Sequence, residues 1–307
     1  MVPWQYFWLR GGNLNMAIKR VGIISPGDMG SAIGKVLSDS GLDVVTCLEG
    51  RSELTRLRAR EAGMRSVPSL DQLISETDLI LSVLVPAQAL ALAELIADSV
   101  RRTGCHPIYA DMNAIAPQTV MRISDVMTNA GVTFIDGGII GSPPKAGSST
   151  RIYCSGPDTT ALESLAQAGL DVRLAGRIIG QASGLKMVYA ASTKGITALW
   201  TELLVAARAL GLEETLMAEF NISGTNISSV LKGRIPSMPR RARRWIGEME
   251  EIAATFENVG LTPRMLLGAA DMYRLVSETP LADQTSREPD PAADTVLQVL
   301  SDRLGQV

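Results

Sequence analysis

A glycine-bearing turn between a strand pattern and a helix pattern is the feature of this sequence that most restricts its fold. The apolar, β-branched run VGIIS (21–25) predicts a strand, and an amphipathic pattern predicts a helix from about Met29 to Ser40. Between them, Gly27 lets the backbone approach a pyrophosphate, and Gly30 lets the helix pack closely on the sheet. The free N–H groups at the helix start attract phosphates. An ordinary strand-to-helix turn is the alternative interpretation.

This context predicts a dinucleotide site on the turn. Ser25 stands where the first glycine of the usual triplet is expected, and the following Pro26 stiffens the turn. The residues expected to contact the dinucleotide here are Ser25, Pro26, Gly27, Asp28, Met29 and Gly30.

Beyond the turn, β-rich runs alternate with helical runs. Helices are expected over 52–63, with Ser52 as N-cap and Thr55 three residues later, and from Pro86 to about residue 101. The further expected strands are 44–47, 65–67, 79–85, 107–112, 132–137 and 151–156. This alternation predicts an α/β fold, a Rossmann-type doubly wound and mostly parallel sheet, which we assign to residues 19–180.

After about Gly180 the strand patterns stop. Residues 183–210 form one long apolar helical pattern, and the rest of the chain alternates helical stretches with short breaks. We therefore assign residues 181–307 to an all-helical domain for substrate binding and dimerisation. Because the long pattern is apolar on more than one face, we expect it to form a homodimer that completes each cleft.

The first residues, 1–18, differ from the rest by their aromatic density, which comes from Trp4, Tyr6, Phe7 and Trp8. They lack the h-region and cleavage site of a signal peptide. Since Met16 precedes the first strand, we expect a loose extension or a translation-start artefact; a hydrophobic anchor is the alternative.

Composition restricts the function more than the fold. A formal net charge of −3 gives no indication of nucleic acid or an anionic membrane as a partner, and the apolar stretches are too short to span a bilayer. Three scattered cysteines argue against a disulfide framework and favour a reducing cytoplasm. His106 is the single histidine and is expected in a loop, so no metal site is predicted. Catalysis must then use Lys, Tyr, Asp, Glu, Ser or a cofactor.

The segment after the second strand bears on the choice of cofactor. An acidic residue there bonds the ribose 2′-hydroxyl of NAD, whereas an arginine accommodates the 2′-phosphate of NADP. Glu49 favours NAD, whereas Arg51, followed by Ser52, favours NADP. Arg56, one turn further on, adds positive charge to the same segment. We predict NADP, with NAD as the less favoured cofactor.

Further stretches follow the turn PGDMGSAIG (26–34) in a fixed order: DMNAIAP (111–117), FIDGGIIGSPPKAG (134–147) and GQASGLKMVYAASTKG (180–195). In this combination the chain resembles the β-hydroxyacid dehydrogenases, relatives of 3-hydroxyisobutyrate and 6-phosphogluconate dehydrogenases. The stretch RARRWIGEMEEIAATFENVGLTP (241–263) is similar to a less common branch of that superfamily. The resemblance implies hydride transfer between a nicotinamide and an alcohol or carbonyl centre of a small polar molecule that can carry a carboxylate.

In that family a lysine on the long helix acts as general acid/base, and Lys186 occupies the matching position. A partly buried lysine with a lowered pKa can exchange a proton near neutral pH. Lys194, two turns further along the same face, is the second candidate. Tyr189 lies on the Lys186 face at i+3, where it either hydrogen-bonds substrate or packs.

Other positions depart from the family pattern. Tyr189 and Ala190 stand where the family has an asparagine, and Glu248–Met249 stand where it often has Lys-Asp. The Ser-Gly-Gly substrate motif reads Ile140–Gly141–Ser142, so Ser142 or the backbone N–H groups of Gly141 and Ser142 must replace the carboxylate-binding serine. The identity of the substrate is therefore left open.

Two smaller matches concern the nicotinamide side. Val85–Pro86 ends a central strand at the switch-point crevice, and Asn113 either bonds the ribose or substrate or serves as a turn residue. A basic run is expected to form a solvated helix face, unless one member turns toward the cleft and selects an anionic group: Arg240, Arg241, Arg243 and Arg244.

Two other functions compete with the alcohol/carbonyl oxidoreductase. Imine reductases resemble this fold, but they usually lack the lysine found here at 186. A non-catalytic NADPH-binding sensor is a different class, which the missing asparagine and serine leave open.

Overall fold

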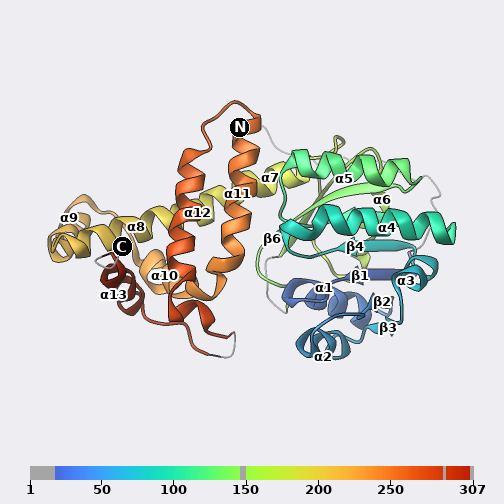
Figure 1. Cartoon of the computed structure of the whole chain (residues 1–307), viewed down its shortest axis with the longest axis horizontal. Helices are drawn as coiled ribbons and strands as arrows, with labels where there is room; N and C mark the ends of the chain where they lie inside the picture. The colour runs from blue at the N-terminus through green and yellow to red at the C-terminus, as the bar shows by residue number, and fades with distance from the viewer. Residues whose placement is uncertain (1–17, 146–149, 286–287, 305–307) are drawn as a thin grey trace.

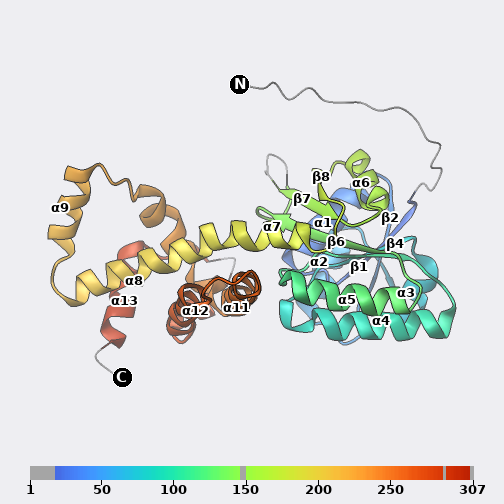
Figure 2. The same cartoon turned by 90° about the horizontal axis from the view of Figure 1, so that it is seen from above.

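The computed structural model describes residues 18–145, 150–285 and 288–304. The expected N-terminal extension, 1–18, lies outside the described residues except for its last residue. Figure 1 shows a sheet flanked by helices and, beside it, a helical bundle. A long helix connects the two parts (Figure 2).

Within the described residues the sheet has eight strands in the order β3-β2-β1-β4-β5-β6-β7-β8. Neighbouring strands are parallel except β6 and β7, which are antiparallel. The order from β3 to β6 is that of a doubly wound Rossmann sheet, which confirms the predicted fold class. The bounds are β1 (Arg20–Ile24), β2 (Asp43–Cys47), β3 (Arg65–Val67), β4 (Leu79–Ser82), β5 (Ile108–Asp111), β6 (Phe134–Ile140), β7 (Arg151–Ser155) and β8 (Val172–Gly176).

Helices cover both faces of this sheet because its central strands are apolar on both sides. On one face, α1 (Asp28–Asp39), α2 (Glu53–Glu61) and α6 (Thr160–Ser164), with the 3₁₀ turn η2 (Leu165–Ala168), share one buried cluster with the strands. On the other, α3 (Leu70–Glu76), α4 (Ala89–Thr103) and α5 (Pro117–Asn129) share a second. The 3₁₀ turn η1 (Pro86–Gln88) leads from β4 into α4.

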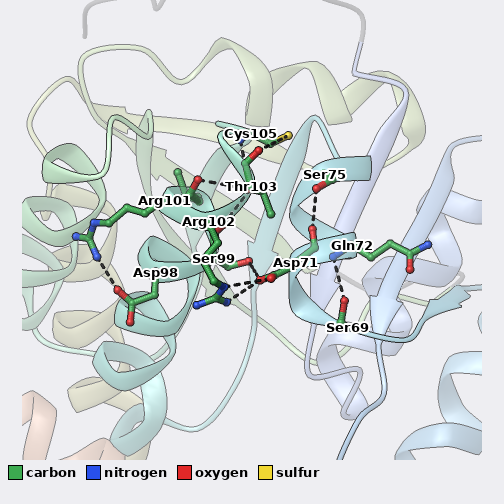
Figure 3. Close-up of polar contacts among 11 residues, drawn as sticks. Ser69, Asp71, Gln72, Ser75, Asp98, Ser99, Arg101, Arg102, Thr103 and Cys105 are labelled. Atoms are coloured by element: carbon green, nitrogen blue, oxygen red, sulfur yellow. Dashed lines mark hydrogen bonds and ion pairs between the residues drawn. The ribbon is translucent and has the colours of Figure 1, made fainter.

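Polar contacts fix α3 against α4 at the edge of the second face (Figure 3). Asp71 on α3 accepts hydrogen bonds from Ser99 and from both Nε and Nη2 of Arg102 on α4. The Arg102 guanidinium, helped by the Ser99 hydroxyl, lowers the pKa of Asp71 to about 2. This cluster lies away from the carboxyl ends of the strands, and we assign it a structural role.

The second part of the described chain is helical, as predicted. Its helices surround a third buried cluster that contains Trp245 and Tyr273. α7 (Gln181–Ala190), the π-helical turn η3 (Ala191–Gly195) and α8 (Ile196–Ala209) continue without a break, and we call them the long helix. The other elements are α9 (Glu213–Ser223), the π-helical turn η4 (Val230–Arg234), α10 (Ile235–Ser237), η5 (Pro239–Arg241), α11 (Ala242–Asn258), α12 (Arg264–Ser277), η6 (Pro280–Asp283) and α13 (Ala293–Arg303).

Some predicted elements have different bounds in the structure. The strand expected over 79–85 ends at Ser82, because the N–H of Leu84 donates to Asn113 Oδ1 (2.6 Å) instead of to a neighbouring strand. The strand expected over 132–137 runs from Phe134 to Ile140, because its last residues pair with the antiparallel β7. Strand β8 has no counterpart in the sequence prediction. None of the described helices combines the length and apolar character needed to cross a bilayer.

Candidate active site

The turn between β1 and α1 has the geometry of a phosphate-binding loop. Ser25 adopts a left-handed conformation (φ 65°), which a glycine usually supplies at this point, and its carbonyl accepts from the N–H of Gly27 (2.7 Å). A Cβ on Gly30 would lie 2.7 Å from the Ser25 carbonyl oxygen, so only glycine fits there. A Cβ on Gly27 would meet no atom within 4 Å, which leaves that side of the turn open to a ligand.

The start of α1 leaves its N–H groups available. Gly27 is the N-cap and makes no side-chain capping hydrogen bond. Asp28 turns away to an ion pair with Arg58 on α2, and Met29 packs on the sheet. The first N–H groups of α1 therefore meet the open side of the turn, where they suit an anion such as a pyrophosphate.

Arg51 and Ser52 lie at the end of the next βα connection. Ser52 caps α2, as predicted, by accepting from the N–H of Thr55 (3.3 Å). Arg56 donates from Nε to the Arg51 carbonyl (3.2 Å), which fixes the backbone of this segment. Arg51 makes no ion pair with any carboxylate in the described part of the chain, so its guanidinium is available to an incoming phosphate.

The switch point of the sheet lies between β1 and β4, where Val85 and Pro86 follow the strand end. The Val85 side chain is 46% exposed, as expected of a residue that lines a crevice. Asn113 is buried and uses its side chain internally: Oδ1 accepts from Leu84 N–H (2.6 Å), and Nδ2 donates to Ser82 Oγ (3.0 Å) and Asp111 Oδ2 (2.9 Å). Of its two predicted roles, these contacts favour the turn role, in which Asn113 positions the loop that carries Val85.

Four buried polar residues form a row across four neighbouring strands of the sheet, close to the switch-point crevice. Ser82, Asp111, Asp136 and Ser155 stand opposite one another on β4, β5, β6 and β7. Burial raises the pKa of Asp111 to about 7, although hydrogen bonds from Asn113 and the nearby Lys186 act in the opposite direction. Two adjacent buried carboxyl groups thus lie beneath the start of the long helix.

Asp136 anchors the long helix to the sheet. Its Oδ2 accepts from the N–H groups of Gly180 (2.9 Å), Ala182 (3.0 Å) and Ser183 (3.2 Å), and its Oδ1 accepts from Ser183 Oγ (2.5 Å). It therefore caps α7 from a different element. Gly138 allows the close approach, because a Cβ there would lie 2.7 Å from the Ala182 carbonyl oxygen and 3.3 Å from Lys186 Cβ.

This anchoring places Lys186 directly over Gly138 of β6. Lys186 is half-buried, and it makes no ion pair with any described residue. Burial lowers its pKa from 10.5 to about 8; Lys194 and Arg244 act in the same direction, whereas Glu248 and Asp111 oppose it. Tyr189, three residues on, is 46% exposed.

Opposite Lys186, α11 contributes a buried carboxylate. Glu248 is 7% exposed and pairs with Lys194 (Oε2–Nζ 2.7 Å) and more loosely with Arg244 (Oε1–Nε 3.4 Å). The surrounding cations and the hydrogen bond from Lys194 lower the pKa of Glu248 in spite of its burial.

The basic run, which spans the end of η5 and the start of α11, is divided between two environments. Arg240 and Arg243 pair with Asp290 and Asp283 of the C-terminal segment (both 2.6 Å). Arg241 donates to Ser237 Oγ, and Arg244 alone turns to Glu248. One member of the run therefore faces the cleft.

The Ile140–Gly141–Ser142 segment follows β6. Ile140 is buried, Gly141 has a positive φ of 122°, and Ser142 is exposed. The Ser142 carbonyl accepts from the hydroxyl of Thr150, which fixes the segment beside the start of β7.

A cavity of about 700 Å³ lies elsewhere, beside α1 and α2 and the segments that flank β7. Neither Lys186 nor Gly27 lines it. Its lining includes the ion pair Lys35–Asp39 and Arg58, which pairs with Asp28, and the candidate site lies instead at the β1–α1 turn and the long helix.

Sequence reasoning missed the roles of Asp136 and Asp111, and saw Glu248 only as a departure. A carboxylate inside an apolar strand was a signal for Asp136. Glu248 had no comparable signal, because its main partner, Lys194, lies 54 residues earlier in the chain.

Comparisons with known proteins agree with this geometry. Residues 20–168 match the NAD binding domain of 6-phosphogluconate dehydrogenase, and residues 207–276 match a domain of unknown function, DUF1932. A solved conserved protein of unknown function, described as structurally similar to 3-hydroxyacid dehydrogenases, is 32% identical, with 84% of this chain and 97% of that chain covered and a TM-score of 0.64.

Two further relatives extend the comparison. An uncharacterized 28.5 kDa protein of Methanothermus fervidus is 28% identical over 260 residues, which are 84% of this chain and 99% of that protein. Mycobacterium tuberculosis 3-hydroxyisobutyrate dehydrogenase, solved with L-serine, shares the fold at 16% identity, with a TM-score of 0.62 and coverage of 92% and 99%. The chain therefore belongs to the family that joins an NAD-binding domain of the 6-phosphogluconate dehydrogenase type to a DUF1932 helical domain, within the fold of the 3-hydroxyacid dehydrogenases.

Proposed function

We propose that this chain is an NADP(H)-dependent oxidoreductase that interconverts an alcohol and a carbonyl in a small polar, carboxylated molecule. The observation that carries the proposal is Lys186: an unpaired, half-buried lysine with a pKa of about 8, at the carboxyl edge of a Rossmann sheet. A proton-transfer group tuned near neutral pH at this edge fits an acid/base role.

The residues of the first βα turn fit a dinucleotide. The uncapped start of α1 and the open side of Gly27 suit the pyrophosphate, and Arg51 with Ser52 suits a 2′-phosphate. When bound, the nicotinamide supplies or accepts the hydride. Val85 and Pro86 are placed to line the ring side of the crevice.

In the reductive direction, Lys186 donates a proton to the substrate oxygen as that oxygen gains negative charge. In the oxidative direction, neutral Lys186 removes the hydroxyl proton. In this proposal the N–H groups of Gly141 and Ser142 bind the substrate carboxylate, and the exposed Tyr189 offers a hydrogen-bonding side chain. Since the pKa of Lys186 is about 8, oxidation should accelerate as the pH rises through 8 and reduction should slow.

The test is substrate-dependent oxidation of NADPH over a panel of carbonyl acids, with imines included, in the wild-type chain and in Lys186→Ala. We expect turnover of a carbonyl acid and its loss in the variant. Turnover of imines alone, or one that survives in Lys186→Ala, would reject the acid/base assignment. Tight NADPH binding without turnover of any compound would instead identify a sensor.

The cofactor preference has its own test. Arg51→Ala should weaken binding of NADPH much more than binding of NADH, because it removes the charge that meets the 2′-phosphate. Equal weakening of both, measured by fluorescence titration, would remove the preference for NADP.

We further propose that the long helix forms a homodimer. Several large apolar side chains on it are exposed, which is costly for a helix left in water: Leu185 (40%), Val188 (57%), Ile196 (41%) and Leu199 (58%). Light scattering at micromolar concentration should give the mass of a dimer, and Leu199→Glu should dissociate it. A monomeric wild-type chain would contradict the proposal.

A further inference from the structure

The ion pair between Lys194 and Glu248 lies directly beside the candidate acid/base lysine. Both side chains are largely buried, with exposed fractions of 16% and 10%, and the Oε2–Nζ distance is 2.7 Å. They come from different elements, η3 and α11, so the pair joins the long helix to the opposite wall. A buried pair of this kind is costly to build and needs an additional reason to be present.

Lys194 is held in place from two further sides. Its ammonium lies 5.9 Å from the centre of the Trp245 ring, and its backbone carbonyl accepts from the Tyr273 hydroxyl (2.6 Å). These contacts fix the ammonium against Glu248 rather than leaving it to move in solvent.

Lys186 is in the opposite situation. It faces Glu248, yet no described carboxylate comes within ion-pair distance of its ammonium. Glu248 already accepts from Lys194 and contacts Arg244 with its other oxygen. The one carboxylate of α11 that could neutralise Lys186 is therefore occupied by two other cations.

We propose that Lys194 is a positioning residue that holds Glu248 away from Lys186 and so keeps Lys186 ready to release its proton. Glu248 stays close enough to attract the Lys186 ammonium through space but does not bond it. The role of Lys186 in turnover rests on the proposed function; the control of its proton affinity by Lys194 and Glu248 does not.

Other charged and titratable groups around these three residues are unchanged in the Lys194→Met and Glu248→Gln variants below. Asp111 on β5 attracts the Lys186 ammonium, and Arg244 on α11 repels it. Tyr273 on α12 lies within the electrostatic reach of both Glu248 and Arg234 of η4. They set the starting proton affinity but give no reason for opposite changes in the two variants.

The experiment measures the proton affinity of Lys186 without turnover. The folded chain is labelled with trace acetic anhydride across a pH series, and mass spectrometry follows acetylation of Lys186. In Lys194→Met, Glu248 is released to pair with Lys186 and the repulsion from the Lys194 ammonium is lost, so the labelling midpoint should rise by about one pH unit or more. In Glu248→Gln the attraction is lost while Lys194 remains, so the midpoint should fall.

Two controls separate this effect from a general loss of packing. Lys194→Arg keeps the ion pair and should leave the midpoint near the wild-type value. Arg244→Met removes the more exposed cation (56%), so its change should be much smaller than that of Lys194→Met. If Glu248→Gln does not fold, Glu248→Asp draws the carboxylate back by one methylene and should lower the midpoint less.

Midpoints that move in the same direction in Lys194→Met and Glu248→Gln, or that do not move, would overturn the inference. The pH dependence of kcat/KM, once a substrate is found, should shift by the same amounts as the labelling midpoints. If labelling shifts as expected while turnover survives in Lys186→Ala, the proposed acid/base role fails and the inference about Lys194 stands.

Discussion

Replacing Lys186 by methionine is expected to raise the free energy of unfolding at pH 7, and part of that gain is expected to disappear as the pH rises. Methionine has a similar length but brings no charge into the cleft. At pH 7 the lysine is protonated in both the folded and the unfolded chain, and burial makes the folded ammonium the less favourable one. The wild-type chain therefore pays a desolvation cost at this site that the variant does not.

The size of the effect follows from the two pKa values. Lys186 has a pKa of about 8 in the folded chain against 10.5 without burial. Between these values the unfolded chain binds more protons at this site than the folded chain, so wild-type stability rises with pH. From pH 7 to pH 9.5 the linkage relation gives a rise of about 2 kcal/mol, an upper value because residual solvent contact screens the charge.

The stability difference between Lys186→Met and wild type should accordingly shrink by up to about 2 kcal/mol between pH 7 and pH 9.5. Urea unfolding at both pH values measures it. Lys35→Met, at an exposed position on α1, is the matched control and should show a difference that does not change with pH. A constant difference for Lys186→Met as well would show that its ammonium is not desolvated, and the argument for a tuned acid/base group would fail.

Three further substitutions test the anchoring of the site, all by chemical denaturation. Asp136→Asn should cost about 3 kcal/mol, since an amide nitrogen would face backbone donors of α7; a loss under about 1 kcal/mol would contradict the capping role. Gly138→Ala should cost about 1–3 kcal/mol because of the contact with the Ala182 carbonyl, whereas Gly247→Ala, with no atom within 4 Å of its Cβ, should gain about 0.5–1 kcal/mol. Equal effects of the two would reject the steric reason. Ser25→Gly should stabilise the chain by about 1 kcal/mol, and no gain would mean that the left-handed turn is unstrained.

The fold was predictable where the signal is local. The strand–turn–helix around Gly27 and the βα alternation that follows define a Rossmann sheet from periodicity and turn residues alone. Strand β8 was missed because it is a short edge strand in which Arg173 and Leu174 are exposed, so its sequence lacks an apolar pattern. The antiparallel β7 was predicted as a strand, but its direction depends on pairing with the extended end of β6 and leaves no local signal.

The site was predictable to a smaller degree. The position of Lys186 follows from its place in the GQASGLKMVYAASTKG stretch. What surrounds Lys186 depends on contacts between distant segments: Asp136 caps a helix 44 residues later in the chain, and Glu248 meets Lys194. Such pairings follow from the crossing of elements, which a single sequence does not specify.

The π-helical turn at Ala191–Gly195 changes the rotational phase of the long helix. A regular α-helix turns about 100° per residue, so two lysines eight residues apart would point about 80° away from each other. The π turn accommodates one extra residue, which reduces the offset to about 20°. Lys186 and Lys194 can therefore both point toward α11. If the same residues kept regular α-helical geometry, with none removed, Lys194 would be turned away from Glu248, so in this helix the π turn brings the second ammonium group to the cleft.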